Sequence, residues 1–292
     1  MIDYKKFLQN SRKWLYDYIK DNCLKSLVIG VSGGIDSTVT CAIVSPVCHD
    51  LGIPLIGRSL PAHTNNPEEI SAATLVGKAF CNDFKEVAIE RMYARVANEI
   101  ELGEGIKLAP LQLGNIKARL RMIYLYNLAS VYNGCVLDTD NRTEHELGFW
   151  TIHGDVGDLN CGLIHLWKTE VYELAKYILT GYKIQSNKTE EIDLAIQALE
   201  KSIALVPTDG NGVMAGGDCA QFGLDNYKQV DDVLKTVYFP DKELDSITFV
   251  NEYTRLIDSY NEQGVDKVMI LHQNTMFKRM YLPIYPKLNN LI

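Results

Sequence analysis

A short stretch near the N-terminus orders glycines, hydroxyls and a carboxylate in a way that suits phosphate binding. Residues 27–31 are apolar and partly β-branched, a Ser-Gly-Gly turn follows at 32–34, and a helix-like segment starts at residue 35. A strand that feeds a tight turn onto a helix N-terminus leaves backbone N–H groups free, and with the helix dipole these favour an anion. Gly33 and Gly34 would let the main chain approach that anion closely.

The side chains of this turn add donors and a possible metal ligand. Ser32, Ser37 and Thr38 could donate hydrogen bonds to phosphate oxygens, and the Asp36 carboxylate suits Mg²⁺. No Gly-Lys-Ser/Thr sequence ends the turn, so it is not a Walker-type phosphate loop. It resembles the Ser-Gly-Gly-x-Asp-Ser loop of the ATP pyrophosphatases, which adenylate a carboxylate or carbonyl oxygen and release pyrophosphate. The alternative is a glycine turn that only packs a helix on a sheet, which the order of strand, glycines, hydroxyls and acid disfavours.

A cluster of cations marks a second segment, residues 114–122. It places Lys117, Arg119 and Arg121 within five positions of a predicted helix. Lys117 and Arg121 are four residues apart and share a face of that helix, whereas Arg119 points elsewhere. An apolar run follows directly, so the helix is expected to be largely buried, and buried cations require anionic partners. We therefore favour contact with a ligand or a subunit over a solvated basic face.

A third group of polar side chains, residues 137–149, follows a predicted strand. So many ionisable or metal-capable residues in one place are costly unless they hold a cation or a polar ligand. Thr139 could bind a nucleotide, and Glu144 could share Mg²⁺ with Asp36. Helix capping by a residue of this group would explain only part of it.

The elements that position these groups predict one α/β domain over residues 1–292, a doubly wound parallel sheet with flanking helices like the adenine nucleotide alpha hydrolases. Strands that alternate with helices imply a parallel sheet, whose site lies beyond the carboxyl ends of its strands. Asp36, Pro61 and Thr139 all follow strand ends, so one crevice could collect them. A flexible loop is expected at the glycine-rich residues 210–217. The expected strands are 26–31, 53–60, 84–89 and 134–138, and the expected helices are 4–22, one from the turn to about 46, 67–80, 91–101, 113–132, 166–179, 189–205 and 226–236.

Composition narrows the class of protein and its partners. The 292 residues carry 29 basic and 37 acidic side chains, a net charge of −8, which argues against nucleic-acid binding. The seven cysteines include no Cys-x-x-Cys pair and are expected to be free thiols in a reducing cytoplasm. No segment is apolar for long enough to span a bilayer, and the N-terminus lacks an apolar signal core. We expect a cytoplasmic protein with no membrane partner.

Taken together, five segments resemble the ammonia-dependent NAD synthetases over roughly residues 8–168, with weaker similarity beyond. They are 32–37, 114–122, 139–144, 148–151 and 154–155. The resemblance implies ATP-dependent amidation of deamido-NAD (nicotinate adenine dinucleotide) to NAD with ammonia, through an adenylated carboxylate and with release of AMP and pyrophosphate. It also implies a homodimer whose interface includes the helix around residues 121–132.

The resemblance assigns a role to each candidate site residue. Asp36 and Glu144 would hold Mg²⁺, and Asp36 and Lys168 would act in catalysis. The residues expected to bind ATP are Gly30, Ser32, Gly33, Gly34, Asp36, Ser37, Thr38, Thr139, Lys168 and Thr208. The residues expected to bind the acid substrate are Arg119, Asp158, Phe277 and Lys278.

Several departures from that family pattern leave alternatives open. Residues 150–152 read Trp-Thr-Ile where the family has Phe-Thr-Lys, so a lysine contact with the substrate is lost. Asp138 replaces a glycine, Phe277 replaces a histidine, the glycine run before Asp158 is one residue short, and residues 182–202 resemble an insertion. The alternatives are the same chemistry on nicotinate mononucleotide, a tRNA-modifying ATP pyrophosphatase, and a nucleotide-binding protein without activity. No residues remain for a glutaminase domain, so we expect ammonia as the nitrogen donor, whether free or supplied by a separate protein.

Overall fold

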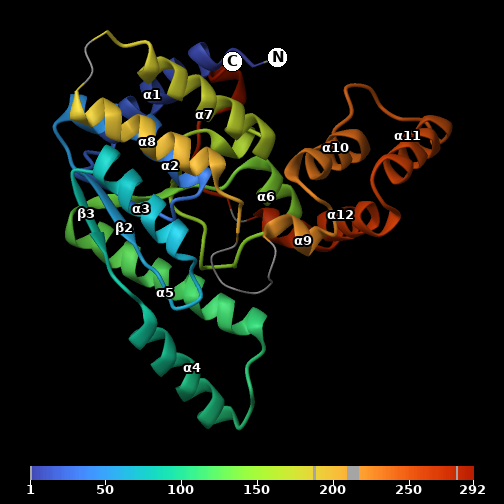
Figure 1. The fold of residues 1–292 in the computed structure, drawn as a ribbon, viewed down its shortest axis with the longest axis horizontal. Helices are drawn as coiled ribbons and strands as arrows, with labels where there is room; N and C mark the ends of the chain where they lie inside the picture. The colour runs from blue at the N-terminus through green and yellow to red at the C-terminus, as the bar shows by residue number, and fades with distance from the viewer. Residues whose placement is uncertain (1, 187–188, 209–216, 281) are drawn as a thin grey trace.

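A computed structural model shows a single parallel sheet with the strand order β3-β2-β1-β4-β5, which confirms the predicted doubly wound α/β fold (Figure 1). The strand β5 was not predicted, because two residues are too few to show a hydrophobic pattern. The strands are β1 (Ser26–Gly30), β2 (Leu55–Ser59), β3 (Asp83–Glu86), β4 (Gly134–Asp138) and β5 (Leu159–Asn160). The structure describes residues 2–186, 189–208, 217–280 and 282–292. Most of the loop predicted at 210–217 lies outside these ranges.

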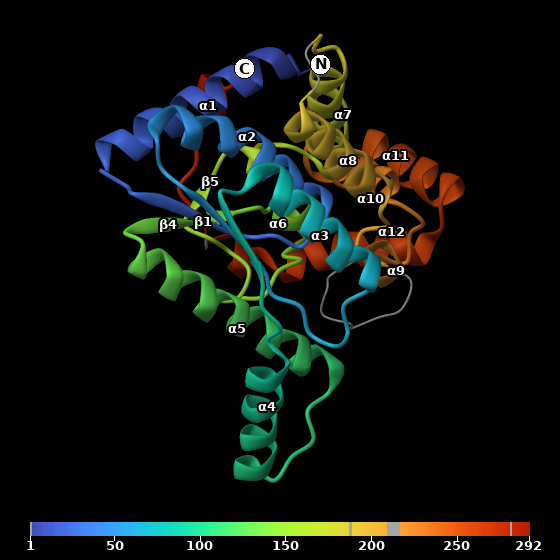
Figure 2. The ribbon, with the colours of Figure 1, turned by 60° about the vertical axis from the view of Figure 1, so that its left-hand side comes forward.

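Helices cover both faces of the sheet (Figure 2). Successive side chains of β1 point to opposite faces, so Leu27 and Ile29 enter one core cluster and Val28 enters another. The helices on the first face are α1 (Tyr4–Asp21), α2 (Ile35–Leu51), α3 (Pro67–Phe80), α7 (Lys168–Lys183) and α8 (Glu190–Ala204). The second face carries α5 (Pro110–Val131). Helix α4 (Glu90–Glu104), which precedes α5 in the chain and contacts it, extends away from the sheet.

A third apolar cluster joins the C-terminal helices, which Figure 1 shows projecting from the side of the sheet. Leu147 and Trp167 belong to this cluster, so the helical lobe is attached where the chain leaves β4. Of the helices in this lobe, sequence periodicity indicated only the one expected at 226–236. Its elements are α6 (Arg142–Leu147), α9 (Asp218–Phe222), α10 (Tyr227–Tyr238), α11 (Ser246–Ser259), α12 (Glu262–Asn274) and the 3₁₀ turn η2 (Met276–Met280). Two further 3₁₀ turns are η1 (Leu163–His165) and η3 (Leu288–Asn290).

Helix α2 corrects one predicted boundary, because it runs through Pro46 to Leu51 instead of ending near the proline. A proline inside a helix removes the hydrogen bond to the carbonyl four residues earlier, here that of Ala42. The guanidinium of Arg12 in α1 donates to this carbonyl at 3.1 Å and to that of Ile43 at 3.2 Å. The unpaired carbonyl is thereby satisfied from a neighbouring helix, a contact that local sequence does not reveal.

No helix in the described part of the chain combines the length and apolarity that a membrane crossing requires. The expected single domain and the expected insertion at 182–202 stay predictions. Within that insertion, α8 packs on both α3 and α7.

Packing of α3 on the sheet gives a stability prediction. A Cβ at Gly77 would overlap the ring of Phe84, so we expect Gly77→Ala to lower the free energy of unfolding by about 1–3 kcal/mol. The matched control is Gly103→Ala in α4, where a Cβ would meet nothing within 4 Å. That change is expected to stabilise the protein by up to about 1 kcal/mol, because alanine favours helix. Urea unfolding of both variants measures the difference, and equal effects would contradict this packing.

Candidate active site

A cavity of about 490 Å³ opens at the carboxyl ends of β1, β2 and β4. Its lining includes Asp36, Pro61 and Thr139, each of which follows the end of a strand. This confirms that one crevice collects the three segments. The fold places the cavity where parallel α/β sheets bind their ligands.

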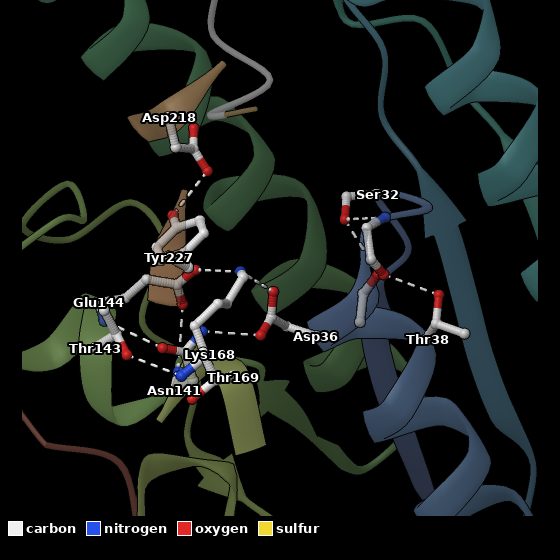
Figure 3. Close-up of polar contacts among 12 residues, drawn as sticks. Ser32, Asp36, Thr38, Asn141, Thr143, Glu144, Lys168, Thr169, Asp218 and Tyr227 are labelled. Carbon is white, nitrogen blue, oxygen red and sulfur yellow. Dashed lines mark hydrogen bonds and ion pairs between the residues drawn. The ribbon is translucent and has the colours of Figure 1, made fainter. Parts of the chain in front are cut away.

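The turn between β1 and α2 forms one wall of the cavity (Figure 3). Gly34 is the N-cap of α2 and no side chain caps this helix, which leaves its first N–H groups directed at the cavity side. Ser32 Oγ accepts a hydrogen bond from the Gly34 N–H at 3.2 Å and lies 3.0 Å from Ser37 Oγ. Gly33 has φ +84°, and a Cβ there would lie 2.5 Å from the carbonyl oxygen of Glu69, so only glycine fits. Hydroxyls and amides therefore converge on one point, as an anion site requires.

Two residues of the turn hold it in shape from outside the cavity lining. Thr38 is fully buried, and its hydroxyl donates to the carbonyl of Gly34 at 2.8 Å. Gly33 packs against α3. Gly30, Ser32, Gly34, Asp36 and Ser37 do line the cavity. The turn thus divides into a face that meets the cavity and a face that supports it.

Opposite the turn, Lys168 lies between two carboxylates (Figure 3). Its Nζ is 2.5 Å from Asp36 Oδ2 and 2.8 Å from Glu144 Oε1, and its side chain is 3% exposed. Asn141 Nδ2 donates to the second oxygen of Asp36 at 2.8 Å. A buried charge needs such partners, because it loses its hydration on burial.

These contacts fix the charges of the cluster. Burial would lower the pKa of Lys168, but the carboxylates of Asp36 and Glu144 outweigh burial and hold that pKa well above its usual value. Burial raises the pKa of Glu144 to about 7, with Lys168 opposing the shift and Asp36 adding to it. Lys168 therefore remains a cation, and its charge opposes the effect of burial on Glu144.

Local structure explains why these side chains meet. Asn141 and Glu144 form the capping box at the start of α6, and Lys168 is the first residue of α7. The Lys168 N–H donates to Thr143 Oγ1 at 2.8 Å. Thr143 in turn donates to Asp231 of α10 at 2.5 Å. Two helix N-termini and a buried acid of the C-terminal lobe thus hold the cluster.

The donor set suits Mg²⁺ only if a ligand completes it. Asp36 and Glu144 each place a carboxylate oxygen against the Lys168 ammonium group. Carboxylate oxygens are ligands that Mg²⁺ prefers. No group of three His, Cys, Asp or Glu side chains among the described residues could hold a metal ion alone. Bound phosphate oxygens and water would have to supply the remaining positions, as is usual for Mg²⁺ at nucleotide sites.

The residues expected to bind the acid substrate separate into two sets. Lys278 lines the cavity and donates to the carbonyls of Gly148 at 2.7 Å and Trp150 at 2.5 Å. The structure does not bring Arg119, Asp158 or Phe277 into the cavity lining.

Each of these three has a different position. Arg119 is exposed, and its Nε donates to the carbonyl of Ile152 at 3.3 Å. Asp158 accepts hydrogen bonds from Tyr126 Oη at 2.9 Å and from the N–H of Val136 in β4 at 3.2 Å, so it joins α5 to the sheet. Phe277 is 56% exposed.

Thr208 lines the cavity and contacts the carboxylate of Glu69 at the start of α3. Both belong to the cavity wall opposite α5, and Glu69 also accepts from the side chain of Asn65 at 3.3 Å. The segment after α8 is therefore tied to the loop that follows β2.

Arg121 and Asp155 are among the charged residues lining the cavity to which sequence reasoning gave no role in the site. Arg121 Nε donates to the carbonyl of Leu60 at 3.0 Å, and its neighbour on the helix face, Lys117, donates to Thr64 at 2.9 Å. From the helix face that they share, these two cations hold the loop after β2, whereas their expected contact with a ligand or a subunit stays a prediction. Asp155 accepts from the N–H of Thr151 at 2.6 Å, and burial raises its pKa.

Comparison with known proteins places the chain in a family. The model of the NAD synthase family matches residues 7–281. An NH(3)-dependent NAD(+) synthetase of Thermoplasma volcanium is 33% identical over 181 residues, 61% of this chain and 69% of that protein. The chain belongs to the NAD synthase family. The similarity to the synthetase of the same description from Pyrococcus furiosus, 29% over 280 residues, covers 95% of this chain and 94% of that protein.

Solved structures agree on the fold of the family. An NMN synthetase from Francisella tularensis superimposes with a TM-score of 0.71 at 24% identity, covering 98% of this chain and all of that one. An NH3-dependent NAD synthetase from Campylobacter jejuni gives a TM-score of 0.65 at 20% identity and 98% coverage of this chain. Membership of the NAD synthase family identifies the chain as an enzyme of this type and extends the similarity into the C-terminal lobe.

The buried ammonium of this NAD synthase family member gives a prediction on stability. Lys168→Met leaves two facing carboxylates without a counter-charge, so we expect a loss of about 3–5 kcal/mol in the free energy of unfolding near neutral pH. Lys168 opposes the rise of the Glu144 pKa to about 7, so in the variant that pKa lies higher still, and the deficit shrinks as the pH falls towards about 7. Denaturant unfolding at several pH values measures this.

The control for that change is Lys176→Met, which removes an exposed ion pair to Glu173 at 2.8 Å. It is expected to stay within about 0.5 kcal/mol of wild type at every pH. A Lys168 variant that behaved like this control would show that the carboxylates do not depend on the ammonium.

Proposed function

We propose that the protein amidates deamido-NAD to NAD with ammonia, at the expense of ATP, and releases AMP and pyrophosphate. The observation that carries the proposal is the cavity in which the amide-rich turn at Ser32 and Gly34 faces the Asp36–Lys168–Glu144 cluster. One side suits the phosphates of ATP, and the other can neutralise their charge. Family membership supports the same activity.

The chemistry follows from the poor electrophilicity of a carboxylate. A substrate carboxylate oxygen attacks the α-phosphorus of ATP, the bond to the β-phosphate oxygen breaks, and pyrophosphate leaves. Ammonia then attacks the acyl carbon, AMP leaves with the electron pair of the C–O bond, and the nitrogen loses a proton. Both steps need in-line positioning and charge neutralisation more than acid or base side chains.

The described residues divide these tasks. The N–H groups at the start of α2 and the Ser32 and Ser37 hydroxyls would bind the departing pyrophosphate, and Lys168 would neutralise it. Asp36 and Glu144 would hold Mg²⁺, which supplies further charge neutralisation when bound. Of the other residues expected to bind ATP, Gly30, Thr139 and Thr208 line the cavity, whereas Gly33 and Thr38 support the turn from outside the lining.

An amidation assay tests the proposal. With ATP, Mg²⁺, ammonium and deamido-NAD, we expect NAD, AMP and pyrophosphate in equal amounts. Asp36→Asn and Glu144→Gln preserve shape but remove charge, and each is expected to lower kcat/KM at least about a hundredfold. Glu173→Gln on the exposed face of α7 is the control and should retain wild-type activity. Full activity in either cluster variant would refute the metal role, and full activity on glutamine would refute ammonia as the donor.

A second candidate substrate, nicotinate mononucleotide, is favoured by one observation. Ile152 stands where the resemblance places a substrate-binding lysine, and neither Ile152 nor Arg119 lines the cavity. The lysine of the family pattern is thus missing, and Arg119, one of the four residues expected to bind the acid substrate, lies outside the cavity wall. The ratio of kcat/KM for the two acids in the same assay decides between them.

We also propose a homodimer that works in the cytoplasm. The outer face of α4 and α5 carries an apolar groove of about 330 Å³, where Ile123 is 53% and Val131 is 71% exposed. An exposed apolar groove on a long helix suits an equivalent surface of a second copy. All seven cysteines are free, which fits a reducing compartment.

A charge in this groove tests the dimer. Ile123→Glu is expected to shift the protein from dimer to monomer in sedimentation velocity, because it buries a carboxylate in an apolar interface. The control is Ile247→Glu on α11, where the side chain is 76% exposed and lies outside the groove. A wild-type monomer at micromolar concentration, or a dimer unaffected by Ile123→Glu, would contradict this interface.

A further inference from the structure

The C-terminal turn of α8 carries a buried hydroxyl that contacts the phosphate-binding turn. Ser202 is 1% exposed, and its Oγ donates to the carbonyl of Gly33 at 2.9 Å. It also lies 2.8 Å from Thr38 Oγ1. Figures 1 and 2 show α8 beside α2 and α3, the helices that enclose the turn. A helix from a segment expected to be an insertion thus reaches the centre of the site.

The two hydroxyls divide the carbonyls of the turn between them. Each hydroxyl has one hydrogen, and Thr38 can use its own on the Gly34 carbonyl at 2.8 Å. The Gly34 carbonyl also accepts from the Ser37 hydroxyl at 3.2 Å and from the Thr38 N–H at 3.1 Å, whereas the side chain that donates to the Gly33 carbonyl is Ser202. Gly33 O therefore depends on Ser202 for its side-chain hydrogen bond.

The direction of one peptide unit depends on this bond. The Gly33 carbonyl and the Gly34 N–H belong to the same trans peptide, in which C=O and N–H point in opposite directions. Holding the carbonyl against α8 aims the Gly34 N–H at Ser32 Oγ, on the cavity side. Because neither residue has a Cβ, the side chains of the two glycines do not fix which way this peptide points, and a flip would turn the carbonyl towards the cavity.

We propose that Ser202 is a positioning residue for pyrophosphate and ATP binding, which acts by fixing the orientation of the Gly33–Gly34 peptide. This role of Ser202 rests on the proposed function, because it requires that the turn at Ser32–Gly34 binds the phosphates of ATP. It predicts an effect on phosphate affinity that loss of packing alone would not cause.

The test compares two hydroxyl deletions. Ser202→Ala is expected to raise the Kd for MgATP measured by calorimetry by about three- to tenfold. The KM for ATP and the inhibition constant of pyrophosphate should rise by about the same factor. The KM for the acid substrate should be unchanged. Ser11→Ala in α1 is the matched control, because Ser11 is also fully buried and also donates to a backbone carbonyl, that of Cys161. Both variants should melt at similarly reduced temperatures, but Ser11→Ala should bind MgATP as tightly as wild type.

A graded variant covers the case in which Ser202→Ala does not fold. Ser202→Cys keeps the size of the side chain but offers a weak S–H donor, so its MgATP affinity should lie between those of wild type and the alanine variant. Unchanged affinity in a folded Ser202 variant, with a wild type that binds MgATP, would overturn the positioning role and leave the proposed function intact. A wild type that binds MgATP but forms no amide would overturn only the function, and one that binds no MgATP would overturn both.

Discussion

The structure depends on one buried ammonium group held between two carboxylates. Lys168 cannot be left unpaired at 3% exposure, and Asp36 and Glu144 cannot lie so close to each other without it. These residues come from the starts of α7, α2 and α6 respectively, so the ion pairs fix three helix N-termini relative to one another. The cavity acquires its shape from the same contacts that supply its charge.

The parts of the site that sequence could predict are those encoded within a few residues. Strand β4 and helix α3 have the predicted bounds, because a glycine stop and an Asn-Pro helix start mark them locally. The turn at Ser32–Gly34 was recognisable for the same reason, since strand, glycines and helix are contiguous. Asp36 and Glu144 both reach Lys168, because the carboxyl ends of neighbouring parallel strands share an edge, whereas their sharing of Mg²⁺ stays a prediction.

What sequence could not predict depends on contacts between distant segments. Arg12 supplies a donor to the carbonyl that Pro46 leaves unpaired, so the helix continues where local rules end it. Arg119 and Arg121 are two residues apart on α5, yet only Arg121 lines the cavity, since helix rotation against the sheet decides which side chain faces inwards. The position of Ser202 could not be predicted, because its contacts with Gly33 and Thr38 join segments that are far apart in the sequence.

The short helix α6 shows how the C-terminal lobe is joined to the chemistry. Its first turn holds Glu144 beside Lys168, and its last turn offers the carbonyl of Glu146 to Arg279 at 2.8 Å. Arg279 follows Lys278, which binds the carbonyls of the segment after α6 and lines the cavity. A movement of the lobe would therefore act on both ends of α6 at once, on Glu144 at its start and on the carbonyls that Lys278 and Arg279 bind at and beyond its end. Since α6 has only six residues, its two ends form one rigid unit, so the position of Glu144 and the contacts of Lys278 and Arg279 are set together.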